Sequence, residues 1–227
     1  MAEPTFHKST AREYFESIVV AVILALFVRT FVVQAFKIPT GSMEPNLLVG
    51  DHLLVNKFIF GPAVSAIERG VLPVRDIKRG DVIVFKFPED PERDFIKRVI
   101  GLPGDTVELR NRELLINGQK LEEPYAHYLF PVGEGQESTS FDVRERYGPV
   151  TVPDLHYFMM GDNRDNSQDS RYWGFLPAHY VKGRALMIYW SFDQPTGEQP
   201  EGLAGLLHTF ASIFTGTRWS RLLHQIH

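Results

Sequence analysis

The feature that most constrains this chain is an apolar stretch near its N-terminus. Residues 18–28 read IVVAVILALFV, Arg29 and Thr30 interrupt the run, and FVVQAF then resumes it. The first run is about 11 residues, or roughly 16 Å as a helix, which is too short for a hydrocarbon core of about 30 Å. All of 18–36 is about 19 residues and does reach across. The sequence therefore predicts a transmembrane helix at 18–36, behind a short tail at 1–17.

Two alternatives for this stretch stay open at this point. A cleaved signal peptide would use the small-x-small site Val-Gln-Ala at 33–35, and a buried core helix would have no membrane role. Basic residues lie on both sides, with Lys8 and Arg12 before the stretch and Arg29 and Lys37 at or after its end. Charge counting therefore does not set an orientation.

Composition narrows the class of protein. The chain has 227 residues, 44% of them hydrophobic and 23% charged, which is typical of one good-sized globular domain with a smaller appendage. Its net charge of -4 does not favour binding to a nucleic acid. The absence of cysteine excludes disulfides, thiolate metal sites and a cysteine nucleophile.

Short segments rich in β-branched and aromatic residues follow the apolar stretch. Gly, Pro, Asn or Asp bound each of them, and no helical period persists for three turns between 37 and 200. This pattern predicts a mostly β, antiparallel fold. The segments are 51–60, 81–87, 95–102, 105–118, 156–162 and 183–192.

The C-terminal region carries a different pattern. Apolar residues recur at spacings of three, four and seven, which predicts an amphipathic helix within 196–227. That helix could pack on its own domain or lie in a membrane interface. The apolar positions are Leu203, Leu206, Leu207, Phe210, Ile213, Phe214, Trp219, Leu222, Leu223 and Ile226.

Metal and histidine chemistry find little support. The segment GDNRDNSQDS at 161–170 has many oxygen ligands, but no register gives the glycine and glutamate of a calcium loop. The eight histidines form no metal-binding pair. His52 follows Asp51 directly, so the two would lie on opposite faces of a strand and not in a Ser-His-Asp arrangement. We expect no cofactor.

A serine and a lysine offer another chemistry. Strand alternation puts Phe95, Lys97 and Val99 on one face and Arg98 on the other. A lysine in an apolar row has a lowered pKa and can act as a general base, although strand lysines commonly extend to water instead. Ser42 lies in the turn IPTGSMEP, which is either an ordinary turn or a rigid support for a nucleophile.

Three segments, in this order and spacing, resemble the signature boxes of bacterial type I signal peptidases. They are IPTGSMEPNLLVGDHLLVNKF, GDVIVFKFPEDPERDFIKRVIGLPGD and FMMGDNRDNSQDSRYWGFLP, and the tail TRWSRLLHQIH is similar as well. The resemblance covers roughly residues 14 to 192. It implies a membrane-bound serine endopeptidase that removes signal peptides after an Ala-x-Ala type site through an acyl-enzyme.

The resemblance also implies a role for each matching residue. Ser42 matches the nucleophile, Lys97 its general base, and Thr40 with the Ser42 N–H the oxyanion hole. Ser167 matches the residue that orients the lysine, with Asp169 and Arg171 as a supporting ion pair. The substrate pockets would be lined by Phe36, Ile38, Met43, Leu47 and Phe95.

The implied organisation is a coiled antiparallel catalytic sheet with an inserted subdomain. The catalytic domain would span 37–105, with an extended ribbon at 59–74, and 155–195, and the insertion would span 106–154. The implied location is the bacterial inner membrane, with the β domain on the extracytoplasmic side and with preproteins and the bilayer as partners. The sequence itself shows one candidate span. The rival hypotheses are a non-catalytic membrane-anchored scaffold and a self-cleaving Ser/Lys repressor.

Overall fold

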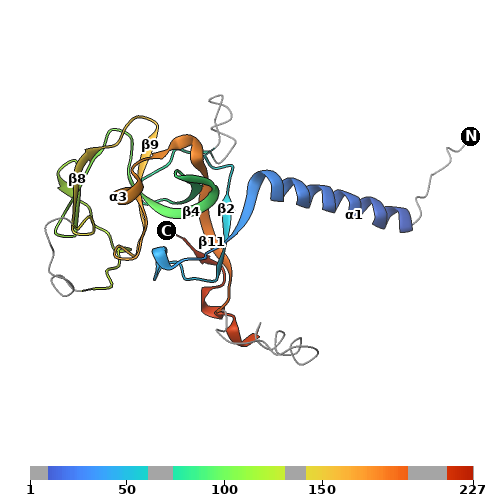
Figure 1. The fold of residues 1–227 in the computed structure, drawn as a ribbon. Helices are drawn as coiled ribbons and strands as arrows, with labels where there is room; N and C mark the ends of the chain where they lie inside the picture. The colour runs from blue at the N-terminus through green and yellow to red at the C-terminus, as the bar shows by residue number, and fades with distance from the viewer. Residues whose placement is uncertain (1–9, 61–73, 131–141, 194–213, 227) are drawn as a thin grey trace, which may run out of the picture.

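Antiparallel β-sheets make up most of the structure, a computed structural model that describes residues 10–60, 74–130, 142–193 and 214–226. The expected mostly β, antiparallel fold is confirmed. Figure 1 shows two sheet regions that form one body, from which a single long helix projects.

The larger sheet contains the strand of Lys97 and the strand that precedes Ser42. Its strands follow the order β1-β2-β11-β3-β4-β9-β10, and β12 pairs with β11. All of these pairings are antiparallel. The strands are β1 (Val33–Lys37), β2 (Asp51–Asn56), β3 (Val82–Phe87), β4 (Asp90–Gly101), β9 (His156–Met160), β10 (Leu176–Pro177), β11 (Val181–Ser191) and β12 (His224–Gln225).

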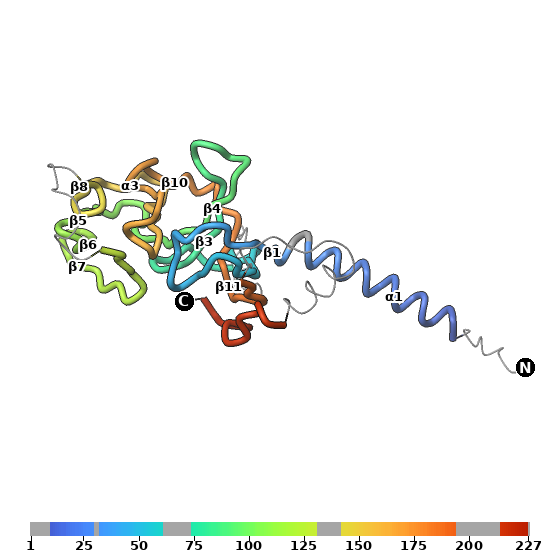
Figure 2. The backbone as a smooth tube through the Cα atoms, turned by 60° about the horizontal axis from the view of Figure 1, so that its bottom comes forward, coloured from blue at the N-terminus to red at the C-terminus, as the bar shows by residue number. Residues whose placement is uncertain are grey.

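A second, four-stranded sheet lies at the end of the body away from the helix, as Figures 1 and 2 both show. Its order is β7-β6-β5-β8, and it comes from the chain between β4 and β9. The strands are β5 (Thr106–Arg110), β6 (Glu113–Ile116), β7 (Gln119–Lys120) and β8 (Arg146–Thr151). Asn111 and Asn117 adopt positive φ in the turns of this meander, a conformation that asparagine tolerates well.

Alternating side chains of the strands build three apolar clusters. One joins β2, β3 and β11 to the segment after β1, and a second fills the space between the four-stranded sheet and β9. The third lies on the other face of β3 and β4 and includes Ile83, Phe85 and Val99. Because β3 and β4 are covered on both faces, nearly all of their central residues are buried.

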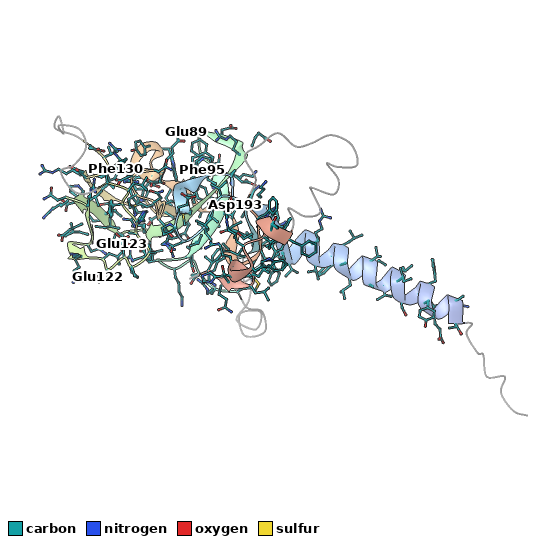
Figure 3. All side chains as sticks on the ribbon, turned by 90° about the horizontal axis from the view of Figure 1, so that it is seen from below. Glu89, Phe95, Glu122, Glu123, Phe130 and Asp193 are labelled. Atoms are coloured by element: carbon teal, nitrogen blue, oxygen red, sulfur yellow. The ribbon has the colours of Figure 1, made fainter. Side chains whose placement is uncertain are left out.

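The N-terminal helix differs from the expected anchor. Helix α1 runs from Thr10 to Phe27, the π-helical turn η1 (Val28–Val32) follows, and Val33–Lys37 then form β1 against β2. The segment 18–36 is therefore not one helix, because its last residues gain backbone hydrogen bonds as a sheet strand. None of the α1 side chains is buried, and Figure 3 shows them standing clear of the body.

At 18 residues α1 is roughly 27 Å long, and its first two turns carry polar residues. In the described parts of the chain, no helix combines the length and the apolar character needed to cross a membrane.

The prediction of an amphipathic helix in the C-terminal region is wrong for residues 214–226, the part of it that the structure describes. Residues 214–216 are helical, but Trp219–Arg221 form the 3-10 turn η4 and β12 then pairs with β11. Leu223 has φ of +57°, a left-handed conformation that cannot continue a right-handed helix. Among the described members of the expected stripe, which begin at Phe214, only Ile226 is buried, and it joins the core of the larger sheet.

Some expectations fall outside the described residues. These are most of the ribbon at 59–74, the polar loop at 131–141 and the C-terminal positions 203–213.

Candidate active site

Ser42 lies in the one-turn 3-10 helix η2 (Gly41–Met43), which three residues separate from the end of β1. Its side chain is 7% exposed, so the hydroxyl is not an ordinary surface turn serine. The turn is held from a distant part of the chain: Asn163 donates its backbone N–H to the Ser42 carbonyl at 3.1 Å and its side-chain amide to the Gly41 carbonyl at 3.1 Å. Met43 and Leu47 fix the following segment in the core.

Lys97 lies on β4, in the apolar row that the strand alternation predicted. Its Nζ is 5.3 Å from the centre of the Phe95 ring, and Phe95 stacks on Phe87 with ring centroids 4.2 Å apart. Phe95 and Val99 belong to the same apolar cluster, whereas Arg98 faces the opposite side. The lysine side chain is 4% exposed, which leaves its amine with almost no access to water.

The structure brings Ser42 and Lys97 into contact. Lys97 Nζ lies 2.6 Å from Ser42 Oγ and donates to the Ile96 carbonyl at 3.0 Å. Burial lowers the pKa of Lys97 from 10.5 to about 8, while the charges of Asp169 and Asp162 act to raise it. About a tenth of the lysine is therefore neutral at pH 7, and a neutral amine at this distance can accept the serine proton.

A buried ion pair lies next to this contact. Arg171 donates to the two carboxylate oxygens of Asp169 at 2.8 and 2.9 Å, and both side chains are at most 1% exposed. Burial acts to raise the pKa of Asp169, but the hydrogen bonds and charge of Arg171 outweigh it and hold that pKa below its usual value. Asp169 also accepts the Gly161 N–H at 3.1 Å and caps helix α3 (Ser170–Trp173).

Ser167 is buried beside this ion pair, but its expected hydrogen bond to the lysine is absent. Within the described residues its hydroxyl does not reach full hydrogen-bond geometry, but it faces Asp169 closely enough to help lower the pKa of that carboxyl. It lies against Gly161, where an added Cβ would collide with the Ser167 side chain and would lie 2.5 Å from the Ser42 carbonyl oxygen. Gly161 therefore allows the segments that carry Ser42 and Ser167 to approach closely.

Thr40 and the expected pocket residues lie in two different environments. Thr40 is exposed and precedes η2 in an extended conformation, without a capping hydrogen bond. Phe36 and Phe95 are partly buried, so part of each ring remains accessible. The other three expected lining residues, Ile38, Met43 and Leu47, are 1–2% exposed and form part of the core.

Two buried ion pairs that the sequence did not predict hold the two halves of the site together. Arg98 and Asp162 form a buried ion pair at 2.7 Å, and Asp162 also accepts from the side-chain amide of Asn46 at 2.8 Å. Arg164 pairs with Glu123 and donates to the Gly161 carbonyl at 3.1 Å. The only signal in the sequence was the density of polar residues at 161–170, which we considered as a possible metal site.

That polar segment is accounted for by ion pairs and backbone hydrogen bonds. Over the described ranges, no group of three or more His, Asp or Glu side chains is placed to hold a metal ion.

Comparison with known proteins gives a consistent assignment. The family model "Signal peptidase, peptidase S26" matches residues 11–190. A signal peptidase I of Pseudomonas aeruginosa is 39% identical over 81% of this chain and 74% of its own length. One from Bacillus amyloliquefaciens is 34% identical over 85% of this chain and 95% of its own length.

Two further relatives show the same family name. A signal peptidase I of Aquifex aeolicus is 33% identical over 82% of this chain and 86% of its own length. A solved signal peptidase I structure from Enterococcus faecalis V583 is 37% identical, covers 48% of this chain and 97% of that chain, and has a TM-score of 0.38. The resemblance read from the sequence is thus confirmed: the chain belongs to the bacterial type I signal peptidases of peptidase family S26, and it is a serine endopeptidase.

Proposed function

We propose that this enzyme removes signal peptides from exported preproteins, with Ser42 as nucleophile and Lys97 as general base. The observation that carries the proposal is the 2.6 Å contact between two buried groups, Lys97 Nζ and Ser42 Oγ. Burial lowers the pKa of the amine to about 8, so a fraction of it is neutral near neutral pH, and a serine needs such a base to become nucleophilic. The family supplies the substrate class, and the residues supply the chemistry.

The reaction proceeds through an acyl-enzyme. Lys97 takes the hydroxyl proton as Ser42 Oγ attacks the scissile carbonyl, and the resulting ammonium gives that proton to the leaving amine. Lys97 then removes a proton from a water molecule that attacks the ester, and it returns that proton to Ser42 Oγ as the bond between Oγ and the acyl carbon breaks and the carboxylic acid product leaves. The ammonium formed in each half-reaction is stabilised by the charges of Asp169 and Asp162, the two carboxylates that act to raise the pKa of Lys97.

The oxyanion is held by the Ser42 N–H and the Thr40 hydroxyl. Thr40 is extended and exposed, so its hydroxyl is accessible to a bound substrate. The Asp169–Arg171 pair fixes the segment around Ser167, which is buried beside it and makes no hydrogen bond to Lys97. Phe36 and Phe95 line the pockets for the small side chains of an Ala-x-Ala type site, with Ile38, Met43 and Leu47 behind them. Such pockets select alanine because larger side chains would overlap their walls.

The enzyme is held at the inner membrane through its N-terminal segment. The exposed apolar side chains of α1, among them Ile18, Val22 and Ile23, have no protein surface to cover them among the described residues. An exposed apolar surface of this size is typical of a membrane interaction site. Tethering of the β domain on the extracytoplasmic side raises its effective concentration at signal peptides, whose apolar segments lie in the same bilayer.

The direct test is cleavage of a preprotein with an Ala-x-Ala site by the purified full chain and by two variants. Ser42→Ala and Lys97→Ala should each abolish cleavage while the far-UV spectrum stays unchanged. Lys120→Ala, which changes an exposed lysine on the four-stranded sheet, is the matched control and should cleave normally. Cleavage by both active-site variants at the wild-type rate would refute the Ser/Lys mechanism.

A further inference from the structure

A hollow of about 780 Å³ lies on the side of the larger sheet to which Arg98 points. It is separate from the active site, because neither Ser42 nor Lys97 lines it. The hollow opens where β11 changes neighbours. One edge of β11 pairs with β3 over Val181–Arg184 and then with β12 at Met187 and Ile188. Figure 2 shows the C-terminal segment, in red, running beside β11.

The lining of this hollow is strongly basic. Six cationic side chains line it, and Asp81 is the one acidic residue among the described residues that do so. The cations come from four separate parts of the chain, so the positive charge is a property of the fold and not of one basic run. They are Arg75, Lys78, Arg79, Arg98, Arg184 and Arg221.

Half of these cations are neutralised by carboxylates that do not line the hollow. Arg79 pairs with Asp105 at 2.9 Å, and Arg98 pairs with Asp162 at 2.7 Å. Arg221 pairs with Asp51 at 2.6 Å, and the same guanidinium nitrogen also donates to the Asn46 carbonyl at 2.8 Å. These three arginines therefore line the hollow, but each arginine–aspartate pair has no net charge.

The remaining cations outnumber their carboxylates. Arg75 and Arg184 share Asp81, at 2.6 and 3.0 Å, and Asp81 also accepts the Lys78 backbone N–H at 2.8 Å. The Arg184 Nε is buried without a hydrogen bond in spite of its short distance to Asp81. The Lys78 side chain is exposed, and its ammonium contacts no carboxylate among the described residues. Asp81 balances only one of these three positive charges.

We propose that this hollow binds a phosphate group. A phosphate carries up to two negative charges and several acceptor oxygens, which suits an uncompensated guanidinium and an ammonium at one rim. The floor contributes apolar surface from Leu47, Val82 and Ile226, so the ligand can carry an apolar part next to the anion. Leu47 is shared with the proposed substrate pockets, but neither Lys78 nor Arg184 takes part in the peptidase chemistry, and the site is therefore an addition to the proposed function.

The position of Arg184 indicates the source of the phosphate. Val33, Asn56 and Arg184 lie in one row across β1, β2 and β11. At about 4.8 Å per strand, Arg184 is roughly 10 Å from the residue that directly follows η1. If the N-terminal segment enters the bilayer, as proposed above, Arg184 lies at the level of lipid headgroups, and Lys78 lines the same hollow. An anionic phospholipid is therefore the expected ligand, and free phosphate is the other source of the same chemistry.

Phosphorus NMR of the full chain in neutral detergent micelles tests the site directly. The probes are inorganic phosphate, dihexanoyl-phosphatidylglycerol and, as a zwitterionic control, dihexanoyl-phosphatidylcholine. The phosphorus resonance of phosphatidylglycerol should broaden when the lipid binds, and that of phosphatidylcholine should not. Lys78→Gln and Arg184→Gln should each weaken binding about fivefold, which is the usual contribution of one basic residue near an anionic lipid surface. Lys120→Gln and Arg110→Gln, exposed on the four-stranded sheet, are the matched controls.

The outcomes separate the possibilities. Binding of phosphatidylglycerol alone supports a lipid headgroup, and binding of inorganic phosphate as well supports a general phosphate site. Equal binding of both lipids, or unchanged binding in the Lys78 and Arg184 variants, would overturn the proposal. Arg184→Gln removes a contact to Asp81 and can destabilise the fold. If Arg184→Gln unfolds, Lys78→Gln is the decisive variant, because the Lys78 side chain is exposed. Ser42→Ala should bind like the wild type, so a failed peptidase mechanism would leave this result unaffected.

Discussion

Arg98 and Asp162 form a fully buried, doubly hydrogen-bonded ion pair directly behind the contact between Ser42 and Lys97. Their nitrogen–oxygen distances are 2.8 and 2.7 Å, and their side chains are 3% and 0% exposed. Arg98 follows Lys97 on β4, and Asp162 holds the side chain of Asn46, four residues after the serine. The pair therefore connects the strand of the base with the segment of the nucleophile.

Loss of one partner of this pair should be costly. Asp162→Ala leaves the Arg98 guanidinium buried without its carboxylate, and we expect the free energy of unfolding to fall by about 3–5 kcal/mol. Denaturant titration of the full chain in neutral detergent measures this. Asp94→Asn, in the partly exposed pair with Lys182, is the control and should cost less than about 1 kcal/mol. Equal losses for both variants would show that burial of the pair has no special role.

The pH dependence of cleavage should follow the lysine. With the pKa of Lys97 at about 8, the neutral amine is a minor species at pH 6 and the major one above pH 8. We expect kcat/KM to rise about tenfold per pH unit below pH 8 and to level off above it, because only the neutral amine accepts the serine proton. Initial rates on a preprotein without groups that titrate in this range give the profile. A flat profile between pH 6 and 9 would exclude Lys97 as the base.

The local part of this site was predictable, and the long-range part was not. Alternation on one strand was enough to place Lys97 with Phe95 on one face and Arg98 on the other, because side chains on a strand follow a period of two. That Asn163 and Asp162 reach the serine turn from more than 100 positions away depends on which strands pair, and spacing alone does not encode it.

The C-terminal region shows how a real pattern can lead to a wrong structure. Trp219, Leu222, Leu223 and Ile226 have helical spacing, but β12 gains backbone hydrogen bonds to the edge of β11 that β3 leaves unpaired. Burial of Ile226 in the core adds to this, whereas Leu223 is 69% exposed. Tertiary pairing thus outweighs a short apolar period, as is common for segments of this length.

The buried lysine should also lower the stability of the fold. In the unfolded chain Lys97 stays protonated up to about pH 10.5, but in the folded protein it loses its proton near pH 8. The unfolded state therefore binds more protons between these values, and stability rises with pH across this window. The loss in free energy of unfolding that results from the lowered pKa of Lys97 reaches its full size below pH 8, where it is roughly 3 kcal/mol.

Lys97→Met measures this cost without reference to catalysis. Its free energy of unfolding should exceed that of the wild type most at pH 7, and the difference should shrink by roughly 3 kcal/mol towards pH 10.5. Lys86→Met, at an exposed position of β3, controls for the removal of a lysine as such. A constant difference between Lys97→Met and wild type across this range would contradict the lowered pKa.

A methyl group at position 161 should disturb catalysis more than folding. The Cβ of Gly161→Ala would lie 2.5 Å from the Ser42 carbonyl oxygen and against the Ser167 side chain. Relief of these overlaps must move the serine turn away from Lys97, and a displacement of about 1 Å can cost about 100-fold in rate. We therefore expect kcat to fall about 100-fold with little change in KM, because the pocket residues Phe36 and Phe95 are not touched. Steady-state cleavage kinetics of a preprotein give both constants.

Gly118→Ala is the matched control for this variant. Gly118 has a φ of +77° in a turn of the four-stranded sheet, and beyond its two chain neighbours no heavy atom of the described residues lies within 4 Å of an added Cβ. Alanine there should cost about 1 kcal/mol of stability through backbone strain and leave kcat unchanged. Ser167→Gly in the Gly161→Ala background removes one overlap but keeps the one with the Ser42 carbonyl oxygen, so kcat should stay low. Full recovery of kcat in that double variant would locate the effect at Ser167 and not at the serine turn.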